Sequence, residues 1–523
     1  MFRRNYPILL FALLFAGASF ALTSCIDDLS TSPIDDDEIT SDVVYDDPEN
    51  FREVLAKLYA GLAVTGQEGP AGDADIDGID EGMSDYLRQY WVHQEIPTET
   101  AVNGWDDPGL PSFNDQSWST GNDFVMGMYS RVFYQISLAN EFIRNAQDED
   151  DAVIQQYHAE ARFLRALSHW HALDLFGGGI PFVTEDDPIG AFEPEPIDAD
   201  GLFDYIESEL LALAEDDAMP APRDNDYGRV DQAAVWTLLA KLYLNAELYT
   251  GQAMWSEAVE YSERVIDEGG YSLHEDYAEL FMADNGENAS DEFIFAIPFD
   301  GSTTQSWGGT TFIINAAIGG DMDAGDFGAE GWAGNRVTPQ LVDKFDEEED
   351  GRAMFFTEGQ NREVEDLSSF SEGYAVTKWS NMTSTGESGP IPHVNTDFPM
   401  FRLADVYLIY AEATVRGGGG DENRALELVN EIRERGYGDE SGHISAGDLD
   451  EELILDERAR ELYWESHRRT DLNRFGKFTG GEYNWAWKGG SQDGSAISDH
   501  KWVYPIPSTD INSNPNLEQN PGY

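Results

Sequence analysis

The sequence predicts a mostly α-helical protein, in which a scaffold of tetratricopeptide-like helical pairs, an α-solenoid, carries a large inserted lobe rich in loops. Several segments combine the apolar spacing of an amphipathic helix with helix start and stop signals. Two of them form helix pairs about as long as a tetratricopeptide unit. The stretches at about 66–118 and 284–394 are instead rich in Gly, Asp, Asn, Ser and Trp. Because helix pairs of this kind cannot bury their apolar faces alone, we expect them to stack, with the loop-rich stretches as excursions.

The start of the chain predicts export and lipid anchoring. Arg3 and Arg4 precede an apolar run at 8–22, which is shorter than the ~20 residues of a membrane-spanning helix and has the form of a signal peptide. Small residues then lead to Cys25, the only cysteine of the chain. This is the pattern of a bacterial lipobox, so we expect residues 1–24 to be a lipoprotein signal peptide and Cys25 to be lipidated. The alternative is an ordinary signal peptide followed by a chance cysteine.

Residues 25–45 are polar and acidic, which predicts a lipidated flexible tether. No later segment is apolar enough to span a bilayer, so anchoring would depend on the acyl chains, at ~0.8 kcal/mol for each buried methylene. Residues 46–523 then form one large domain that contains both loop-rich insertions. We expect the mature protein to start at Cys25 and to be held at a membrane surface.

The first helices of this domain can be bounded from the sequence. Pro48 opens an apolar-periodic run, as proline often does at the first helical position. A second helix is expected over about 123–146 and a third over about 152–176, where three consecutive glycines end it. His169 and His171 lie two apart on the third helix and therefore do not share a face. We expect both histidines to be core residues.

The later helices carry the solenoid pattern. The pair at 229–268 and the pair at 401–436 alternate small and large apolar residues along facing helices. In the second pair Asp421 can cap the second helix and Gly436 can end it. A final helix is expected over about 449–474. Short β-like runs such as 293–297 interrupt the loop-rich stretches.

The charge balance of the chain is strongly acidic. There are 31 basic residues against 101 acidic ones, for a net charge of −70. Nucleic acid is excluded as a partner, because binding phosphates requires clustered cations. The acidic residues are spread along the whole chain, which suits a protein in concentrated salt, where repulsion between like charges is screened.

Three groups of motifs stand out along the chain. They are AEARFLRA at 159–166 with LFGG at 175–178 and IPFVTE at 180–185; LDERAREL at 455–462 with ESHR at 465–468 and DLNRFGK at 471–477; and the tail YPIP at 504–507 with NPNL at 514–517 and QNPGY at 519–523. In this order they resemble the SusD/RagB family of nutrient-binding outer-membrane lipoproteins. The helix that starts with RLAD at 402–405 adds to the resemblance, which covers nearly the whole mature chain. Two small departures are an extra glycine, Gly179, and Ser466 in place of a usual glycine; neither is expected to disturb the fold.

The resemblance implies both a location and a function. It implies a lipid-anchored protein exposed at the surface of the cell outer membrane. It would bind an oligosaccharide or polysaccharide nutrient and deliver it to a TonB-dependent, SusC-like transporter. A peptide-binding, RagB-like uptake lipoprotein is the first alternative, and a glycoside hydrolase is a weaker one.

The motifs are interpreted as structural. Residues such as Glu457, Glu461 and Glu465 recur with arginines at helical spacings, so acid and base are expected to meet on one helix face, partly buried at helix junctions. The proline-rich tail is expected to be an extended cord that packs across the scaffold. No nucleophile elbow, P-loop or HExxH metal motif is present, so we expect a binding protein that is not an enzyme and needs no cofactor.

The candidate ligand-binding residues are tryptophans in the loop-rich stretches. A sugar ring presents a flat C–H face that stacks on an aromatic ring, while its hydroxyl groups need amide and carboxylate partners. By similarity to starch-binding members of the family, Trp105 and Trp332 lie in suitable regions, with Trp307 third. The predicted site therefore comprises the following residues: Trp105, Trp332, Trp307, Asn103, Asp106 and Asn335, with Tyr90 and Trp91 as further candidates. For each tryptophan, simple packing of the lobe is the alternative.

A calcium site is a weak alternative use of the acidic loop. Asp73, Asp75 and Asp77 match the first half of a calcium-binding loop, but Ser84 stands where the bidentate glutamate is needed. Chance clustering of aspartates in an acidic chain is the better explanation of the match.

Overall fold

The computed structural model describes residues 44–45, 47–190 and 192–523. The chain divides into two units, 1–51 and 52–523, and the second carries the fold from the second turn of α3 onward. The helices are α3 (Pro48–Ala60), α4 (Tyr86–Glu95), α5 (Pro111–Asn114), α6 (Asp123–Ala146), α7 (Ala152–Phe176), α8 (Ala199–Ala214), α9 (Gln232–Leu244), α10 (Ala246–Thr250), α11 (Trp255–Glu268), α12 (Asn285–Asn288), α13 (Gly309–Ala317), α14 (Pro339–Val342), α15 (Leu403–Ala413), α16 (Glu422–Tyr437), α17 (Glu451–Leu462), α18 (Arg468–Arg474) and α19 (Ser508–Ser513). The predicted signal peptide, the lipidation site Cys25 and nearly all of the tether lie outside the described residues.

Short antiparallel strand pairs complete the secondary structure. The strands are β1 (Val102–Asn103), β2 (Ile180–Pro181), β3 (Pro196–Ile197), β4 (Phe293–Ile297), β5 (Asn335–Arg336), β6 (Phe355–Phe356), β7 (Ala375–Val376) and β8 (Phe398–Arg402). They pair as β1–β5, β2–β3, β4–β8 and β6–β7. Only β4 and β8 are as long as five residues, and both are fully buried. The prediction of a mostly helical protein is confirmed.

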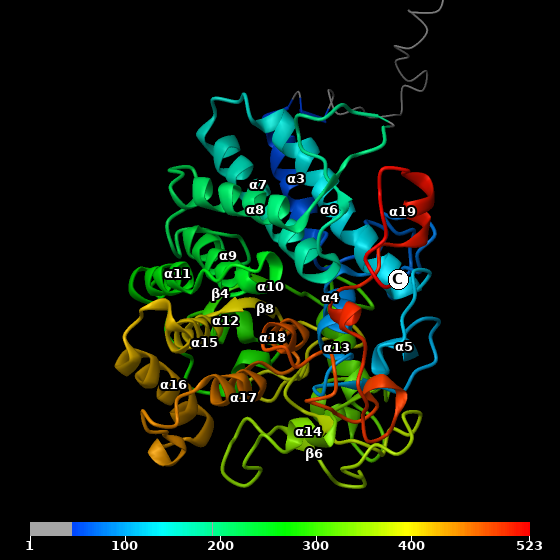
Figure 1. The fold of residues 1–523 in the computed structure, drawn as a ribbon, viewed down its shortest axis with the longest axis vertical. Coiled ribbons are helices and arrows are strands. Elements are labelled where there is room, and N and C mark those ends of the chain that lie inside the picture. The colour runs from blue at the N-terminus through cyan, green and yellow to red at the C-terminus, as the bar shows by residue number, and fades with distance from the viewer. Residues whose placement is uncertain (1–43, 46, 191) are drawn as a thin grey trace, which may run out of the picture. The chain divides into compact units, whose positions relative to one another are not determined.

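The scaffold is a row of stacked helices. α6 packs on α7, α7 on α8, α8 on α9, α9 on α11, α11 on α15 and α15 on α16, and Figure 1 shows α7, α8, α9, α11, α15 and α16 following one another down one side. Several of these helices begin at acidic or amide caps: Asn122 accepts hydrogen bonds from the first turn of α6, Asp151 from α7 and Asp231 from α9. Gly177, at φ 71°, ends α7. The predicted bounds of α6 and α7 are confirmed.

The predicted loop-rich stretches contain two buried helices that sequence patterns did not reveal. All ten residues of α4 and all nine residues of α13 are buried. A helix that is buried on every side has no solvent-exposed face, so its polar and apolar residues need not follow the amphipathic period; α4 buries even Arg88 and Glu95. Trp91 lies in the core with its side chain fully buried, and Tyr90 is buried as well, so the suggestion that these two residues join the ligand site is wrong.

The predicted single helix at 449–474 is in fact two helices. α17 ends at Leu462, Trp464 and Ser466 take positive φ angles of 65° and 66°, and α18 starts at Arg468. The turn is held by the buried Glu95 carboxylate, whose Oε1 accepts the N–H groups of Ser466 at 2.7 Å and His467 at 3.3 Å. Burial raises the pKa of Glu95 to about 7. Ser466 therefore occupies a left-handed position that favours glycine.

Buried ion pairs join α17, which carries the LDERAREL motif, and the turn after it to other elements, including β8. Arg402 donates to Glu465, to Glu461 and, at 2.9 Å, to Glu292, and every side chain of this cluster is at most 1% exposed. Arg352 adds pairs to Glu457 and Glu461, both buried. These charges were predicted to be partly buried at helix junctions, which is confirmed. Most of the pairs, however, join separate elements instead of neighbouring turns of one helix.

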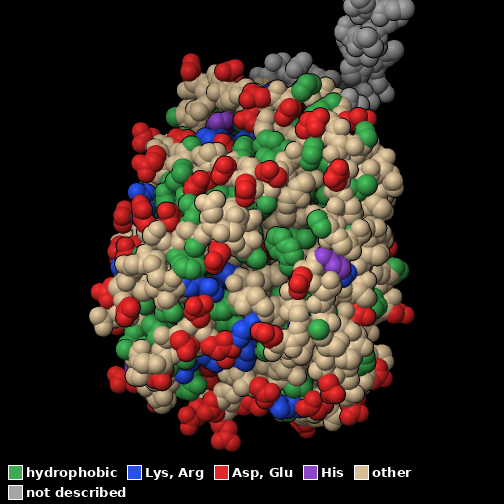
Figure 2. All heavy atoms as spheres, viewed as in Figure 1, with side chains coloured by type: hydrophobic (Ala, Val, Ile, Leu, Met, Phe, Trp, Pro, Cys, Tyr) green, Lys and Arg blue, Asp and Glu red, His purple; other side chains and the backbone are tan. Residues whose placement is uncertain are grey.

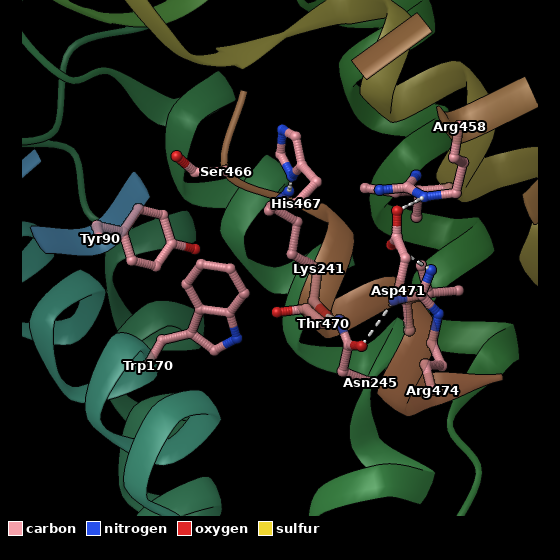
Figure 3. A pocket seen from close by; sticks show the side chains of 12 residues that line it. Tyr90, Trp170, Lys241, Asn245, Arg458, Ser466, His467, Thr470, Asp471 and Arg474 are labelled. Atoms are coloured by element: carbon pink, nitrogen blue, oxygen red, sulfur yellow. Dashed lines mark hydrogen bonds and ion pairs between the residues drawn. The ribbon is translucent and has the colours of Figure 1, made fainter. Parts of the chain in front are cut away.

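A second group of buried charges lines a small internal cavity between α4, α7, α9 and α18. Figure 3 shows Asp471 between Arg458 and Arg474, and these pairs measure 2.9 Å and 2.7 Å. Lys241 lies close by and donates to Asp405 at 2.6 Å. The cavity holds ≈10 Å³, about one water molecule. It is therefore a detail of the packing and too small for a ligand.

The C-terminal tail crosses the scaffold as predicted. The Tyr504 hydroxyl donates to the carbonyl of His93 at 2.7 Å, and the Asn520 amide donates to the carbonyl of Phe176 at 2.8 Å. His169 and His171 are buried core residues, as expected. Within residues 44–45, 47–190 and 192–523, no helix is both long and apolar enough to cross a bilayer. Figure 2 shows acidic side chains over the whole visible face and basic ones at far fewer places.

Candidate functional site

The three predicted tryptophans come together, although they lie in three separate segments of the chain. The ring centroids of Trp105 and Trp332 are 6.4 Å apart, and those of Trp332 and Trp307 are 6.0 Å apart. The indole N–H of Trp105 donates to the carbonyl of Trp332 at 3.2 Å. All three side chains are half-buried. The three rings form a contiguous aromatic face, which we call the tryptophan platform.

The row of rings continues beyond the tryptophans at both ends. Phe312 of α13 lies 5.9 Å from Trp105, and His393 lies 4.6 Å from Trp307. Phe312 is buried beneath the platform, and His393 is fixed by a hydrogen bond between its Nδ1 and the carbonyl of Ser306 at 3.0 Å. Sequence reasoning missed both residues. No local pattern marks His393, because only the fold brings residues 393 and 307 together.

Asp85 and Arg88 of α4 position the Trp307 loop. Asp85 caps α4 by accepting the Arg88 N–H at 2.8 Å, and the same Oδ1 accepts the Gly309 N–H at 2.9 Å. The guanidinium of Arg88 donates to the carbonyl of Trp307 at 3.3 Å and lies 4.5 Å from the ring centre of Phe312. Burial raises the pKa of Asp85 to about 6 and lowers the pKa of Arg88 to about 10.

The Trp105 and Trp332 loops are held by backbone contacts. The N–H of Trp332 donates to the carbonyl of Asn315 at the end of α13 at 2.7 Å. The ring of Trp105 lies on Gly334, where a Cβ would come within 2.5 Å of the indole, so only glycine fits. The buried guanidinium of Arg336 donates to the carbonyls of Gly334, Leu367, Ser369 and Glu372, at 2.7–3.1 Å. The platform is therefore assembled before any ligand arrives.

The predicted polar residues of the site divide into two groups. Asp106 is exposed beside Trp105, where it is free to contact a ligand. Asn103 and Asn335 are 1% and 0% exposed, and the Asn103 amide donates to Asn335 at 2.6 Å. Asn103 also accepts the N–H of Trp105 at 2.8 Å. These two asparagines therefore hold the strand pair β1–β5 behind the platform, which corrects their predicted place among the residues that face a ligand.

The calcium alternative gains no support. Among the described residues, no group of three or more His, Cys, Asp and Glu side chains is arranged to hold a metal ion. Asp75, one of the three candidates, pairs instead with Lys57 at 3.4 Å. Asp73 and Asp77 are the other two candidates, and Asp77 is exposed to solvent.

The platform offers stacking surface and hydrogen-bonding groups at its edge. Glu330 accepts the indole N–H of Trp332 at 3.3 Å, and Asp106 adds a second carboxylate near Trp105. Aromatic faces with carboxylates around them suit a ligand that is flat and apolar on one side and rich in hydroxyl groups at its edge. This arrangement supports recognition of a ligand by stacking.

Comparisons with known proteins agree with this architecture. Residues 358–523 match the family model described as SusD family. The chain is 36% identical to the starch-binding protein SusD of Bacteroides thetaiotaomicron, over 98% of each chain. It is 26% identical to SusD-like protein P2 of Formosa agariphila, over 78% of this chain and 83% of that one.

Solved structures show the same fold. Surface glycan-binding protein A from Bacteroides fluxus superposes with a TM-score of 0.71 at 21% identity, covering 91% of this chain and 100% of that one. Surface glycan-binding protein A from Bacteroides thetaiotaomicron, in complex with laminarihexaose, superposes with a TM-score of 0.68 at 19% identity, covering 90% and 99%. With a 36% identical relative matched from end to end, the chain belongs to the SusD family.

Proposed function

We propose that this protein is a surface-exposed, lipid-anchored outer-membrane protein that captures an oligosaccharide or polysaccharide nutrient and delivers it to a TonB-dependent, SusC-like transporter. The observation that carries the proposal is the tryptophan platform, in which three half-buried rings meet on one face. The names of the similar proteins, a starch-binding protein and surface glycan-binding proteins, support a glycan ligand. These names denote binding and not catalysis, so no bond of the glycan is expected to be cleaved.

The platform would bind a sugar by stacking it on rings that are already in position. The apolar C–H face of a sugar displaces water from the platform, while carboxylates at its edge accept hydrogen bonds from the sugar hydroxyls. Because Trp105, Trp307 and Trp332 are already held in place, little side-chain entropy is lost on binding. The ligand is held tightly enough to be captured and is released chemically unchanged.

A glycan-array screen of the protein lacking residues 1–25, run at molar salt, tests this function. We expect binding to one class of glucan or related glycan and no sugar products on incubation. Binding to peptides with no glycan binding would instead favour a peptide-uptake role, and released sugars would contradict the binder assignment. Variants Trp105→Ala and Trp332→Ala locate the site on any glycan that binds.

The anchor and the partner need tests in the membrane. Cys25→Ala is expected to release the protein from the outer-membrane fraction, because the lipid would be lost with the thiol. Purification of the wild-type protein under gentle detergent and high salt is expected to recover a large TonB-dependent barrel with it. Retention of Cys25→Ala in the membrane, or isolation of the wild type as a lone monomer, would contradict these two parts of the proposal.

A further inference from the structure

A second aromatic pocket lies away from the tryptophan platform, beside α3. Its cavity measures ≈280 Å³ and has a mostly apolar and aromatic lining. Leu55, Ala56, Tyr59, Tyr157, Tyr227 and Pro298 form that lining, with Arg52, Asp226 and Arg229 as its charged groups. This size and composition, apolar walls with a few charged groups, is typical of a small-ligand site. We call it the tyrosine pocket.

Tyr227 is the most exposed ring of this pocket and is nevertheless held firmly. Its side chain is 44% exposed. Its hydroxyl donates to the buried carboxylate of Asp397 at 2.8 Å, so the ring cannot turn freely. A fixed and exposed ring offers a stacking surface at a low entropy cost.

Of the other two tyrosines, Tyr59 is held by a hydrogen bond and Tyr157 by contact with a guanidinium. The Tyr59 hydroxyl donates to Glu160 at 2.6 Å, and the guanidinium of Arg229 lies 5.2 Å from the ring centre of Tyr157. Arg229 in turn is fixed by Glu160, which is itself fully buried. The three rings and their charged neighbours therefore form a preorganised site, with donors and acceptors close to the apolar walls.

The tyrosine pocket is physically tied to the tryptophan platform. Besides binding the Tyr227 hydroxyl, Asp397 accepts the N–H of Phe299 at 2.7 Å. The ring of Phe299 lies directly against Gly309, whose N–H is bound by Asp85, the residue that positions the Trp307 loop. Contacts through Asp397, Phe299 and Gly309 thus connect the two sites, and a ligand that occupies both at once must be a polymer.

We propose that the tyrosine pocket is a second glycan-binding site, which engages a distant part of the same polysaccharide chain that the tryptophan platform holds. This inference rests on the proposed glycan-binding function. Sugar rings stack on Tyr227 and Tyr157, and Asp226 and Arg229 contact their hydroxyl groups. Two sites on one polymer raise the affinity without any new contact at either site, because the second binding step is intramolecular. The protein therefore selects for long chains.

The test compares short and long glycans on the full-length lipoprotein in detergent and molar salt. The probes are maltotriose against soluble starch, and laminaritriose against laminarin, measured by calorimetry or affinity electrophoresis. Tyr227→Ala is expected to weaken binding of the polymer by about tenfold and to leave binding of the trisaccharide unchanged. Tyr227→Phe keeps the ring and should retain most of the polymer affinity. Trp332→Ala should weaken binding of both.

The outcomes separate this inference from the proposed function. If Trp332→Ala weakens glycan binding and Tyr227→Ala changes neither ligand, the second site is refuted and the platform stands. If Tyr227→Ala spares glycan binding but loses the co-purifying barrel, the pocket binds a protein partner, which also overturns the inference. If the wild-type protein binds neither series, the proposed function fails and this inference fails with it. A matched melting temperature for Tyr227→Ala excludes misfolding as the cause of a loss.

Discussion

Two regions of the molecule use buried arginine in opposite ways. One is the ion-pair cluster around Arg402, which we call the junction, and the other is the tryptophan platform. At the junction, Arg402 is paired with three carboxylates from distant elements, and every partner is buried. Behind the platform, Arg336 is equally buried but bonds only to backbone carbonyls. The first arrangement fixes the angle between whole elements, whereas the second fixes a few loops so that rings stay half-exposed. Charge pairs therefore hold the architecture, and hydrogen bonds from charged side chains to the backbone shape the recognition surface.

The largest expected effect is the loss of stability when one buried partner at the junction is removed. Arg402→Met removes the cation that three buried carboxylates share, although Glu292 and Glu461 keep Arg435 and Glu465 keeps Lys378 as a second partner. The excess negative charge left in the core costs about 3–5 kcal/mol. Arg424→Met is the control, because Arg424 pairs with the half-exposed Asp267 at the surface, where a pair contributes about 0–1 kcal/mol. Urea unfolding at molar salt measures both free energies of unfolding. Equal effects would show that the junction is no more dependent on its charges than the surface is.

Substitutions on the platform are expected to separate binding from stability. Trp105→Ala and Trp332→Ala should each weaken glycan binding by about thirtyfold, or ~2 kcal/mol, while the melting temperature stays nearly unchanged. Trp464→Ala is the matched control, since its ring is fully buried and truncation should cost about 3–5 kcal/mol of stability. If the two platform variants unfold like Trp464→Ala and their folded fraction still binds, the platform rings are packing residues.

The two regions should also respond to pH with opposite signs. The surrounding arginines lower the pKa of Glu461 to about 2 despite its burial, so its contribution to stability is present above its ordinary value near 4.5 and is lost as pH falls toward 2. Burial raises the pKa of Asp85 to about 6, so the folded state retains a proton that the unfolded state has released, and stability falls as pH rises from about 4 to 6. Asp85→Asn should flatten that fall in pH-dependent melting curves. An unchanged slope would refute the role of Asp85.

Salt should act on the surface and not on the junction. Lowering ionic strength from 1 M to 0.01 M lengthens the screening distance from about 3 Å to about 30 Å, so a surface with net charge −70 repels itself more strongly. The melting temperature of the wild type should fall as salt is removed. The difference between wild type and Arg402→Met should stay constant, because buried pairs are little screened. A wild-type melting temperature independent of salt would contradict adaptation to high salt.

The smallest expected effect is a gain in stability from restoring glycine at the turn between α17 and α18. Ser466 has φ 66°, a left-handed conformation that costs an L residue about 1–2 kcal/mol. Ser466→Gly should therefore stabilise the protein by up to about 1 kcal/mol, after the larger chain entropy of glycine is subtracted. Ser466→Ala, which keeps the Cβ, is the control and should give little gain. A loss of stability in Ser466→Gly would mean that the serine side chain contributes to the packing.

Most of the helical scaffold could be predicted from the sequence. The apolar period and caps of α6 and α7 predicted their bounds, because local signals act within a few residues. The motifs also predicted the family, the buried charges at helix junctions and the tail that crosses the scaffold. The sequence also indicated the three tryptophans as candidate ligand-binding residues, because aromatic residues on Gly- and Asn-rich segments are conspicuous.

The features that could not be predicted from the sequence depend on contacts between residues that are far apart in the chain. α4 and α13 are buried on all sides, so no periodic pattern marked them. The turn at Ser466 exists because Glu95, far away in the chain, binds its N–H groups. The partners of Arg402, the burial of Asn103 and Asn335, and the addition of His393 to the platform are likewise set by packing across the fold. The energy of a contact between two residues depends on their distance in space, and the sequence alone does not give that distance.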